Sequence, residues 1–260
     1  MKRPVLFISI LSIIFLSACE KEIKVDLKDA EQKFVVEAFI TDSLGFNEVK
    51  ITKSAGFYDD NIFPPVSGAS INITDGNSNY SFTEIEPGIY KSNSIIAQQG
   101  ITYTLNINHT EFQTSATSTV PTKIEIDSLA IEETVGFGGK DYRPRVYFSD
   151  PANEQNYYRF ILYINNKKQN DIYALSDLYF NGKNTSYPLF GSNVKPLDTI
   201  KVELYSIDKA NYIYFNTLDE IANSGFSGTI PGNPENNFDN QNILGYFGAY
   251  TVSVDSLIFK

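Results

Sequence analysis

Residues 69–85 read ASINITDGNSNYSFTEI, and this stretch decides the fold. Ile71 and Ile73 alternate with polar residues on one side of a Gly-Asn-Ser-Asn turn, and a second alternating run follows the turn. An apolar residue at every second position is the period of a strand with one buried face. A short run rich in Gly and Asn between two such segments is typical of a hairpin. The stretch therefore predicts two antiparallel strands.

The same alternation extends along residues 33–121. Turn residues recur at short intervals, no helical spacing interrupts the strands, and Pro121 ends the series. This pattern predicts an antiparallel β-sandwich. The other predicted strands are KFVVEAFIT, NEVKITKS, GIYKSN, GITYTLNINH and EFQTSATSTV.

A second β-rich domain is predicted over residues 122–260. The closing stretch NILGYFGAYTVSVDSLIFK reads as two strands split around Gly248. We therefore expect a mainly β protein of two sandwich domains, Ig-like or transthyretin-like. The remaining predicted strands of this domain are IEIDSLAIEE, RPRVYFSD, NYYRFILYINNK, IYALSDLYF and DTIKVELYSI.

One segment, at about residues 208–224, has helical spacing. Asp208 can cap its start and Gly225 can end it in a left-handed turn. We expect this single helix to lie on the second domain. The side chains that can share one face are Ala210, Ile213, Thr217 and Ile221.

Three connecting segments are candidate partner-binding loops: residues 55–68, 135–144 and 225–242. The last is rich in Gly, Pro and Asn and has no periodicity, and long loops of this kind often serve binding. The alternative is an ordinary surface connection. The aromatic residues that we assign to binding are Phe57, Tyr58, Phe63, Phe137, Tyr142, Phe226 and Phe238.

The N-terminus predicts an export signal. Lys2 and Arg3 precede an apolar segment that is too short to cross ~30 Å of hydrocarbon. Residues 16–19, LSAC, resemble the bacterial lipobox. That resemblance implies that residues 1–18 are removed and that Cys19 carries acyl chains on its sulfur and its new amine, which gives a firm anchor. The alternative is a secretory signal with an incidental cysteine.

Residues 19–32 are predicted to be a flexible, charged tether that holds the folded part off the bilayer. The run Glu20-Lys21-Glu22 looks like the surface-export signals of Bacteroidetes lipoproteins. A plain solvated linker is the alternative.

Composition argues against several classes of partner and cofactor. The formal net charge of −10 disfavours a nucleic-acid partner, which usually needs a basic face. Cys19 is the single cysteine and His109 the single histidine, so neither a disulfide nor a zinc site of the usual type is expected. We expect no metal and no cofactor.

No catalytic motif stands out. His109 is the single imidazole, and no GxSxG elbow surrounds any serine. The run that begins at Asp75 mimics part of an EF-hand, but Tyr80 occupies the loop position that needs glycine. Paired acids such as Glu132-Glu133 point to opposite faces of a strand, so they do not preset a glycosidase geometry. We therefore predict no catalytic residue.

A tripeptide of Asp, a hydroxyl residue and an aliphatic residue occurs four times, and it looks like the Bacteroidetes O-glycosylation sequon. The alternative is structural, because Asp followed by Ser or Thr also ends turns well. The candidate modification sites are Ser43, Ser128, Thr199 and Ser256.

The order of motifs along the chain resembles the DUF4249 family of Bacteroidetes lipoproteins. The motifs are VVEAFIT, PPVSGASINITDG, PGIYKS, GITYTLNI, STVPTKIEIDSL and NILGYFGAYTVS. The N-terminal part also looks like the carboxypeptidase-regulatory or transthyretin-like sandwich. The resemblance implies an outer-membrane setting beside a TonB-dependent receptor that imports nutrients, and it implies no catalytic residues.

These observations predict a non-enzymatic accessory lipoprotein of the outer membrane. It would face the cell surface, with the periplasmic face as the alternative, and would bind a receptor barrel or an extracellular glycan or peptide. Two other functions stay open: a surface glycan hydrolase that uses paired carboxylates, and a passive structural or adhesin module.

Overall fold

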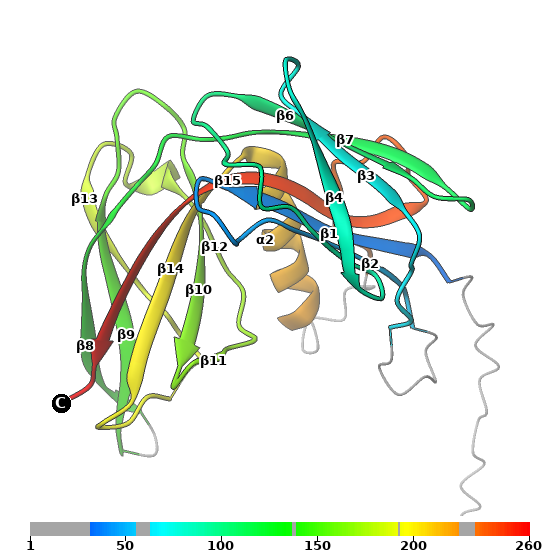
Figure 1. Cartoon of the computed structure of the whole chain (residues 1–260). Helices are drawn as coiled ribbons and strands as arrows, with labels where there is room; N and C mark the ends of the chain where they lie inside the picture. The colour runs from blue at the N-terminus through cyan, green and yellow to red at the C-terminus, as the bar shows by residue number, and fades with distance from the viewer. Residues whose placement is uncertain (1–31, 56–62, 137–138, 192, 224–231) are drawn as a thin grey trace, which may run out of the picture. The chain divides into compact units, whose positions relative to one another are not determined.

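Most of the strands belong to one large mixed sheet, shown in Figure 1. The computed structural model describes residues 32–55, 63–136, 139–191, 193–223 and 232–260. The sheet has twelve strands in the order β11-β10-β14-β15-β1-β2-β5-β4-β3-β6-β7, with β12 also paired to β10. Its strands are β1 (Phe34–Thr41), β2 (Glu48–Lys53), β3 (Ser70–Thr74), β4 (Asn79–Glu86), β5 (Ile89–Lys91), β6 (Thr102–Asn108), β7 (Gln113–Thr119), β10 (Tyr157–Ile164), β11 (Lys167–Lys168), β12 (Tyr173–Ser176), β14 (Thr199–Ile207) and β15 (Ile243–Ile258).

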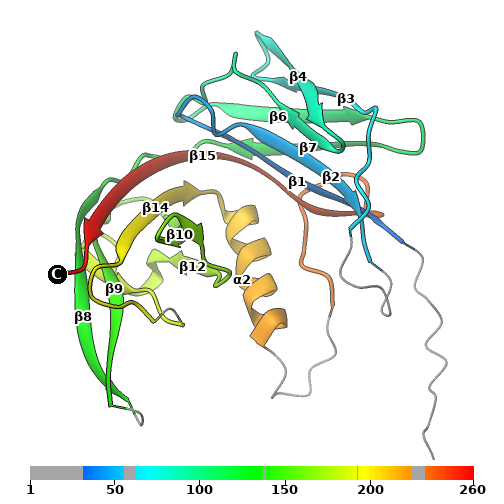
Figure 2. The same ribbon diagram turned by 60° about the horizontal axis from the view of Figure 1, so that its bottom comes forward.

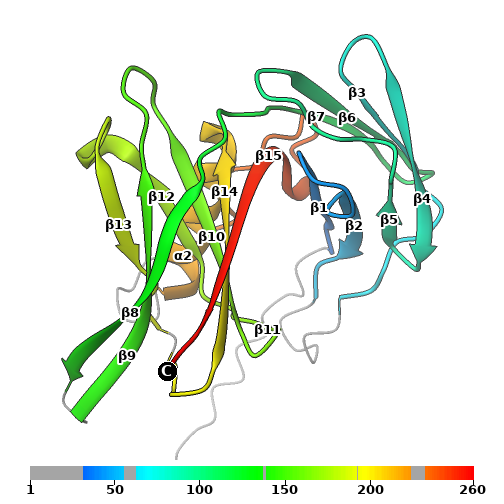
Figure 3. The same ribbon diagram turned by 60° about the vertical axis from the view of Figure 1, so that its left-hand side comes forward.

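A smaller sheet of three strands lies against β10 and β14 (Figure 3). It is formed by β8 (Ile126–Gly136), β9 (Gly139–Ser149) and β13 (Asn184–Pro188). Aromatic side chains fill the space between the two sheets: the ring centroids of Phe148 and Tyr158 are 5.0 Å apart, and Phe160 stacks on Tyr187 at 5.5 Å. The predicted mainly β, sandwich-type fold is confirmed.

The hairpin predicted over residues 69–85 is present as β3 and β4. Ile71 pairs with Phe82 in antiparallel register, and both side chains are buried. Their neighbours on the opposite face are polar and reach the surface. The alternation in the sequence thus reports the real burial of the two faces.

Strand β15 differs from its prediction in two ways. It is one continuous strand instead of two, and it pairs in parallel with β1 and antiparallel with β14 (Figure 2). Gly248 does not break it; a Cβ atom built on Gly248 would lie 1.9 Å from the Tyr250 ring, so this glycine makes room for an aromatic neighbour.

Because β15 runs along both halves of the chain, it contributes to the packing of each half. Phe247 lies in the core of the N-terminal strands, whereas Leu257 packs against the core between β10 and β9. Residues 32–260 form one compact unit. The division into domains at residue 121 stays a prediction.

The helix α2 (Lys209–Asn223) begins where the sequence predicts. The Asp208 carboxylate accepts a hydrogen bond from the Asn211 backbone N–H at 2.9 Å, as an N-cap does. The helix buries Asn211, Tyr214 and Phe215 and leaves Ala210 exposed, so the predicted apolar face is wrong. The cause is aromatic packing on the sheet: the Phe215 ring lies 4.8 Å from that of Tyr246. Gly225 falls outside the described residues. One 3-10 turn, η1 (Asp177–Tyr179), follows β12.

Candidate functional site

The outer surface of β3, β6, β7 and the first half of β4 carries no charged side chain on the strands themselves. Every outward position on these four strands over the ranges given below is Ser, Thr, Asn or Gln, although one residue in five of the whole chain is charged. We call this surface the polar face. It comprises Ser70, Asn72 and Thr74; Asn79, Ser81 and Thr83; Thr102, Thr104, Asn106 and Asn108; and Gln113, Ser115, Thr117 and Thr119.

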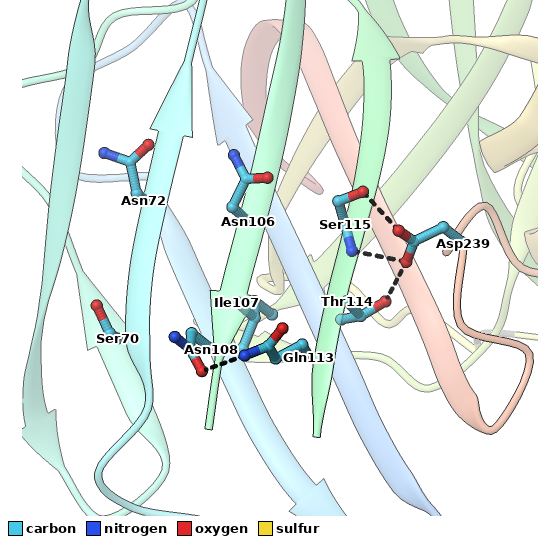
Figure 4. Close-up of a pocket in the computed structure, with 9 residues that line it drawn as sticks. All are labelled: Ser70, Asn72, Asn106, Ile107, Asn108, Gln113, Thr114, Ser115 and Asp239. Atoms are coloured by element: carbon cyan, nitrogen blue, oxygen red, sulfur yellow. Dashed lines mark hydrogen bonds between the residues drawn. The ribbon is translucent and has the colours of Figure 1, made fainter. Parts of the chain in front are cut away.

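A hollow of about 420 Å³ lies on the polar face, and we call it the polar cleft (Figure 4). The strand register places Asn72 directly opposite Asn106, and Asn106 opposite Ser115. Cross-strand neighbours of this kind have side chains close enough to contact one ligand together. The cleft is lined by Ser70, Asn72, Asn106, Ile107, Asn108, Gln113, Thr114, Ser115 and Asp239.

Two of the side-chain amides that line this cleft, those of Asn72 and Asn106, are free to form hydrogen bonds with a ligand. Gln113 donates to the Asn108 side-chain oxygen at 3.2 Å, but the Asn72 and Asn106 side chains make no hydrogen bond within the described residues. Asparagine is disfavoured in strands, so Asn72 and Asn106 weaken the sheet without an internal bond in return. Each amide therefore offers a donor and an acceptor to a ligand.

Asp239 forms a fixed wall of the cleft. Its carboxylate accepts hydrogen bonds from the Thr114 hydroxyl at 2.9 Å, and from the Ser115 backbone N–H and hydroxyl, both at 2.8 Å (Figure 4). These donors, the Ser115 N–H first, hold the pKa of the Asp239 carboxyl below its ordinary value. The carboxylate is thus ionised and fully engaged, and its role is to position the loop.

The loop that carries Asp239 covers the free edge of β7. Asn237 and Asn240 donate from their side-chain amides to the Thr117 and Gln113 carbonyls at 3.0 and 3.1 Å. The Asp239 backbone N–H donates to the Ser115 carbonyl at 3.0 Å. An edge strand exposes unpaired backbone groups, and here loop residues satisfy them. The signal in the sequence was the run of Asn and Asp at residues 236–242, which composition alone assigned to a loop.

Phe238 is a correction. We assigned it to partner binding, but it is only 3% exposed and belongs to the core of the N-terminal strands. Its polar neighbours turn toward β7, which directs the phenyl ring inward. A ring in this position stabilises the loop and cannot reach a partner.

The other predicted loop residues are placed differently. Phe63 is 52% exposed and stays available for contact. Segment 135–144 is mostly the end of the β8–β9 hairpin instead of a loop, and the half-buried Tyr142 packs on Phe259 at 5.0 Å. The predictions for Cys19, Phe57, Tyr58, Phe137 and Phe226 lie outside the described residues.

The four candidate glycosylation sites lie on or next to strands. Ser128, Thr199 and Ser256 are exposed, and Ser43 is half-buried. The preceding aspartates have structural partners: Asp42 accepts a hydrogen bond from the Val252 backbone N–H at 2.9 Å, for example. This geometry accounts for the Asp residues, and modification of the hydroxyls stays a prediction.

A second hollow of about 420 Å³ lies between the C-terminal end of α2 and β12, and we call it the aromatic cleft. Two carboxylates line it. Burial raises the pKa of Asp219, and the charges of Glu220 and Asp171 raise it further, although a hydrogen bond from Asn223 opposes the shift. The Asp171 carboxylate packs against Gly191, where a Cβ atom would come within 2.4 Å of it. The aromatic residues that line this cleft are Tyr173, Tyr187 and Phe190.

The motifs that mimic catalytic or metal sites have structural roles here. Asp75 accepts hydrogen bonds from the Asn77 and Ser78 backbone N–H groups at 2.9 and 2.7 Å, which close the hairpin turn and lower its pKa. His109 accepts one from the Glu111 N–H at 3.3 Å. Within the described ranges, no three His, Cys, Asp or Glu side chains cluster as metal ligands. No helix in the same ranges has the length and apolar character needed to cross a bilayer.

Comparison with known proteins identifies a family but no activity. No curated protein matches this chain. Two solved chains, each described as a cytokine receptor complex, are 10% identical to it, with TM-scores of 0.26 and 0.25. The first match covers 68% of this chain and 92% of the other, and the second covers 86% and 94%; likeness at this level carries no structural or functional argument. The family described as DUF4249, a domain of unknown function, matches residues 20–256, and the chain belongs to that family.

Proposed function

We propose that this chain is a non-enzymatic binding protein that is anchored in the outer membrane through Cys19. It binds neutral, hydroxyl-rich ligands such as glycans in the polar cleft. The observation that carries the proposal is the pair of open amides, Asn72 and Asn106, side by side in a cleft whose single lining acid, Asp239, is already hydrogen-bonded to Thr114 and Ser115.

The chemistry of the cleft supports a sugar-like ligand. A sugar hydroxyl both donates and accepts a hydrogen bond, and so does a side-chain amide. A few well-placed polar groups in a hollow fix the orientation of a small ligand. Because the Asp239 carboxylate is already hydrogen-bonded and the other lining residues are neutral, a neutral ligand would not have to desolvate an unpaired charge.

The test compares Asn-to-Ala variants in and outside the cleft. Titration calorimetry of the purified chain with neutral xylo-, malto- and manno-oligosaccharides should show binding to at least one of them. We expect N72A/N106A to weaken that binding about tenfold or more, because two hydrogen bonds are lost. The control N79A removes an amide from the same face but outside the cleft. If the double variant binds as tightly as N79A, or if none of these oligosaccharides binds, the proposal is wrong.

The proposed location in the outer membrane rests on residues 16–19, LSAC, and on the outer-membrane location implied by the family resemblance. In this proposal the chain acts beside a TonB-dependent receptor and passes its ligand to that barrel. C19S should release the protein from sedimented membranes and abolish incorporation of labelled palmitate. Crosslinking in intact cells should recover the wild-type chain with a barrel protein, and recovery of the chain alone would contradict the receptor partnership.

The aromatic cleft favours a second candidate function, a surface glycan hydrolase. Asp171 and Asp219 line one hollow, and the raised pKa of Asp219 is a property of a general acid. Release of reducing ends from a glycan panel by the wild-type chain, and its loss in D219N, would establish this function. Hydrolysis that persists in D219N would exclude Asp219 as its acid.

A further inference from the structure

A third hollow, of about 220 Å³, brings together two cationic side chains, and we call it the cationic pocket. Arg159 comes from the middle of β10, and Lys168 comes from β11, which pairs with the end of β10 as a hairpin (Figure 1). The chain as a whole carries a net charge of −10, so a pocket with two positive charges is a local exception. The remaining lining residues are Phe160, Ile161, Gln169, Asn170, Asp171 and Ile172.

The nearby glutamates do not neutralise this pocket, because each already has a lysine partner. The charges of Glu37, Glu48 and Glu203 all act on Lys168. Their ion pairs are Lys50–Glu37 at 3.1 Å, Lys91–Glu48 at 3.2 Å and Lys201–Glu203 at 2.8 Å. Within the described residues, neither Arg159 nor Lys168 forms an ion pair. Before Asp171 is counted, these three glutamates stand against five cations, a surplus of two positive charges.

Arg159 is held in place by aromatic contacts. Its guanidinium carbon lies 3.7 Å from the centre of the Phe215 ring on α2. Burial raises the pKa of the Tyr246 hydroxyl, and the positive charge of Arg159 nearby opposes that rise. Stacking of this kind fixes a guanidinium group but does not neutralise it. A fixed fork of N–H donors is the usual means by which proteins bind carboxylates, sulfates and phosphates.

The lowered pKa of Lys168 indicates that the positive charges of Arg159 and Lys168 repel each other. Lys168 is exposed at the surface, yet desolvation by its surroundings is the main cause that lowers the pKa of its ammonium group, and repulsion from Arg159 is the next. An anion placed between the two would remove this repulsion. The Asn170 amide, which makes no hydrogen bond within the described residues, adds a neutral donor on the same wall.

Asp171 also lines the pocket and is the one acid there. Its carboxylate packs against Gly191 on the side of the aromatic cleft, and this contact does not neutralise its charge. With Asp171 counted, the pocket keeps a surplus of one positive charge.

We propose that the cationic pocket binds an oxyanion, either the carboxylate of an acidic sugar or a sulfate or phosphate group, through Arg159 and Lys168. This site is separate from the polar cleft and does not depend on the function proposed for that cleft.

Neighbouring lysines in β11 provide a matched test. The full chain is titrated calorimetrically with sodium sulfate, sodium phosphate and sodium glucuronate, at constant ionic strength set with chloride. We expect K168Q to weaken binding of the preferred anion about tenfold, because one charge-assisted contact is lost. K167Q makes the same change in charge one residue away but outside the pocket lining, and it should bind as the wild type does.

The three anions distinguish an acidic sugar from a tetrahedral anion, and the two lysine variants distinguish a specific site from a general effect of charge. Selective binding of glucuronate would identify an acidic sugar, and selective binding of sulfate or phosphate would identify a tetrahedral anion. Equal losses in K167Q and K168Q would show a general charge effect, and no binding of any of the three anions would show an empty pocket; either result overturns the proposal. N72A/N106A should keep full anion affinity, so failure of the polar cleft would not count against this site.

Discussion

Some residues in this protein are required by the space that a neighbouring side chain needs, and not only by the strand that they occupy. Gly248 and Tyr250 lie two positions apart on β15, so their side chains point to the same face. The Tyr250 hydroxyl donates to the Asn211 side-chain oxygen at 2.6 Å, deep below α2. A glycine at position 248 therefore lets a buried tyrosine reach the helix.

G248A should accordingly destabilise the fold. The new methyl group would meet the Tyr250 ring 1.9 Å away, and overpacking of this kind costs about 1–3 kcal/mol. Urea unfolding followed by far-ultraviolet circular dichroism measures the change. G232A is the matched control, because a Cβ atom there meets nothing within 4 Å. Equal stabilities for the two variants would show that Tyr250 can move aside at no cost.

At the scale of elements, the alternation of apolar and polar residues predicted the strands that have one buried and one exposed face. The β3–β4 hairpin and β6 each have one buried and one polar face, and their periodicity was visible. Strand β15 is buried on both faces from Tyr246 to Ser253, so its sequence carries no period that shows its neighbours. Its parallel pairing with β1 joins residues more than 200 positions apart, which no local pattern encodes.

The candidate site was less predictable than the fold. Asn72 and Asn106 belong to different hairpins, and only the register of β3 with β6 makes them neighbours. Their rarity as strand residues was the available signal. Arg159 and Lys168 carry no sequence signal of a site, and they stand out only because the nearby glutamates pair with other lysines in the folded chain.

Removal of the Asp239 carboxylate should loosen the edge of the large sheet. D239N keeps the shape of the side chain but loses the charge-assisted bonds to Thr114 and Ser115, which we expect to cost about 1–3 kcal/mol. Hydrogen exchange of the Ser115 amide should speed up, measured by mass spectrometry on β7 peptides. D141N, on an exposed part of β9, should leave this exchange unchanged.

The same variant gives a pH dependence of known sign. The folded-state pKa of Asp239 is below its ordinary value of 3.8, so its stabilising contribution is present above that value and is lost as the pH falls. The gap in unfolding free energy between wild type and D239N should therefore close progressively as the pH drops below about 4. A gap that stays constant down to low pH would mean that the bonds, and not the ionised state, carry the effect.

At the scale of the whole molecule, β15 makes the two halves depend on each other. It completes the sheet beside β1 and also pairs with β14, and the residues that follow Gly245 supply side chains to the cores on both sides. Separation of the halves would require the loss of one ladder or the other. We expect residues 32–260 to unfold in a single transition, as two-state domains do.

Three Val-to-Ala variants test this coupling. Val49 lies in the N-terminal core and Val202 in the core between the two sheets, and both are fully buried. V49A and V202A should each cost about 2–3 kcal/mol through lost burial and the cavity left behind, and each should lower one shared calorimetric transition. V135A, at a position that is 84% exposed, should leave that transition in place. If V49A shifts one transition and V202A another, the halves unfold independently, β15 is not the joint that its pairing indicates, and the boundary predicted at residue 121 is a real domain boundary.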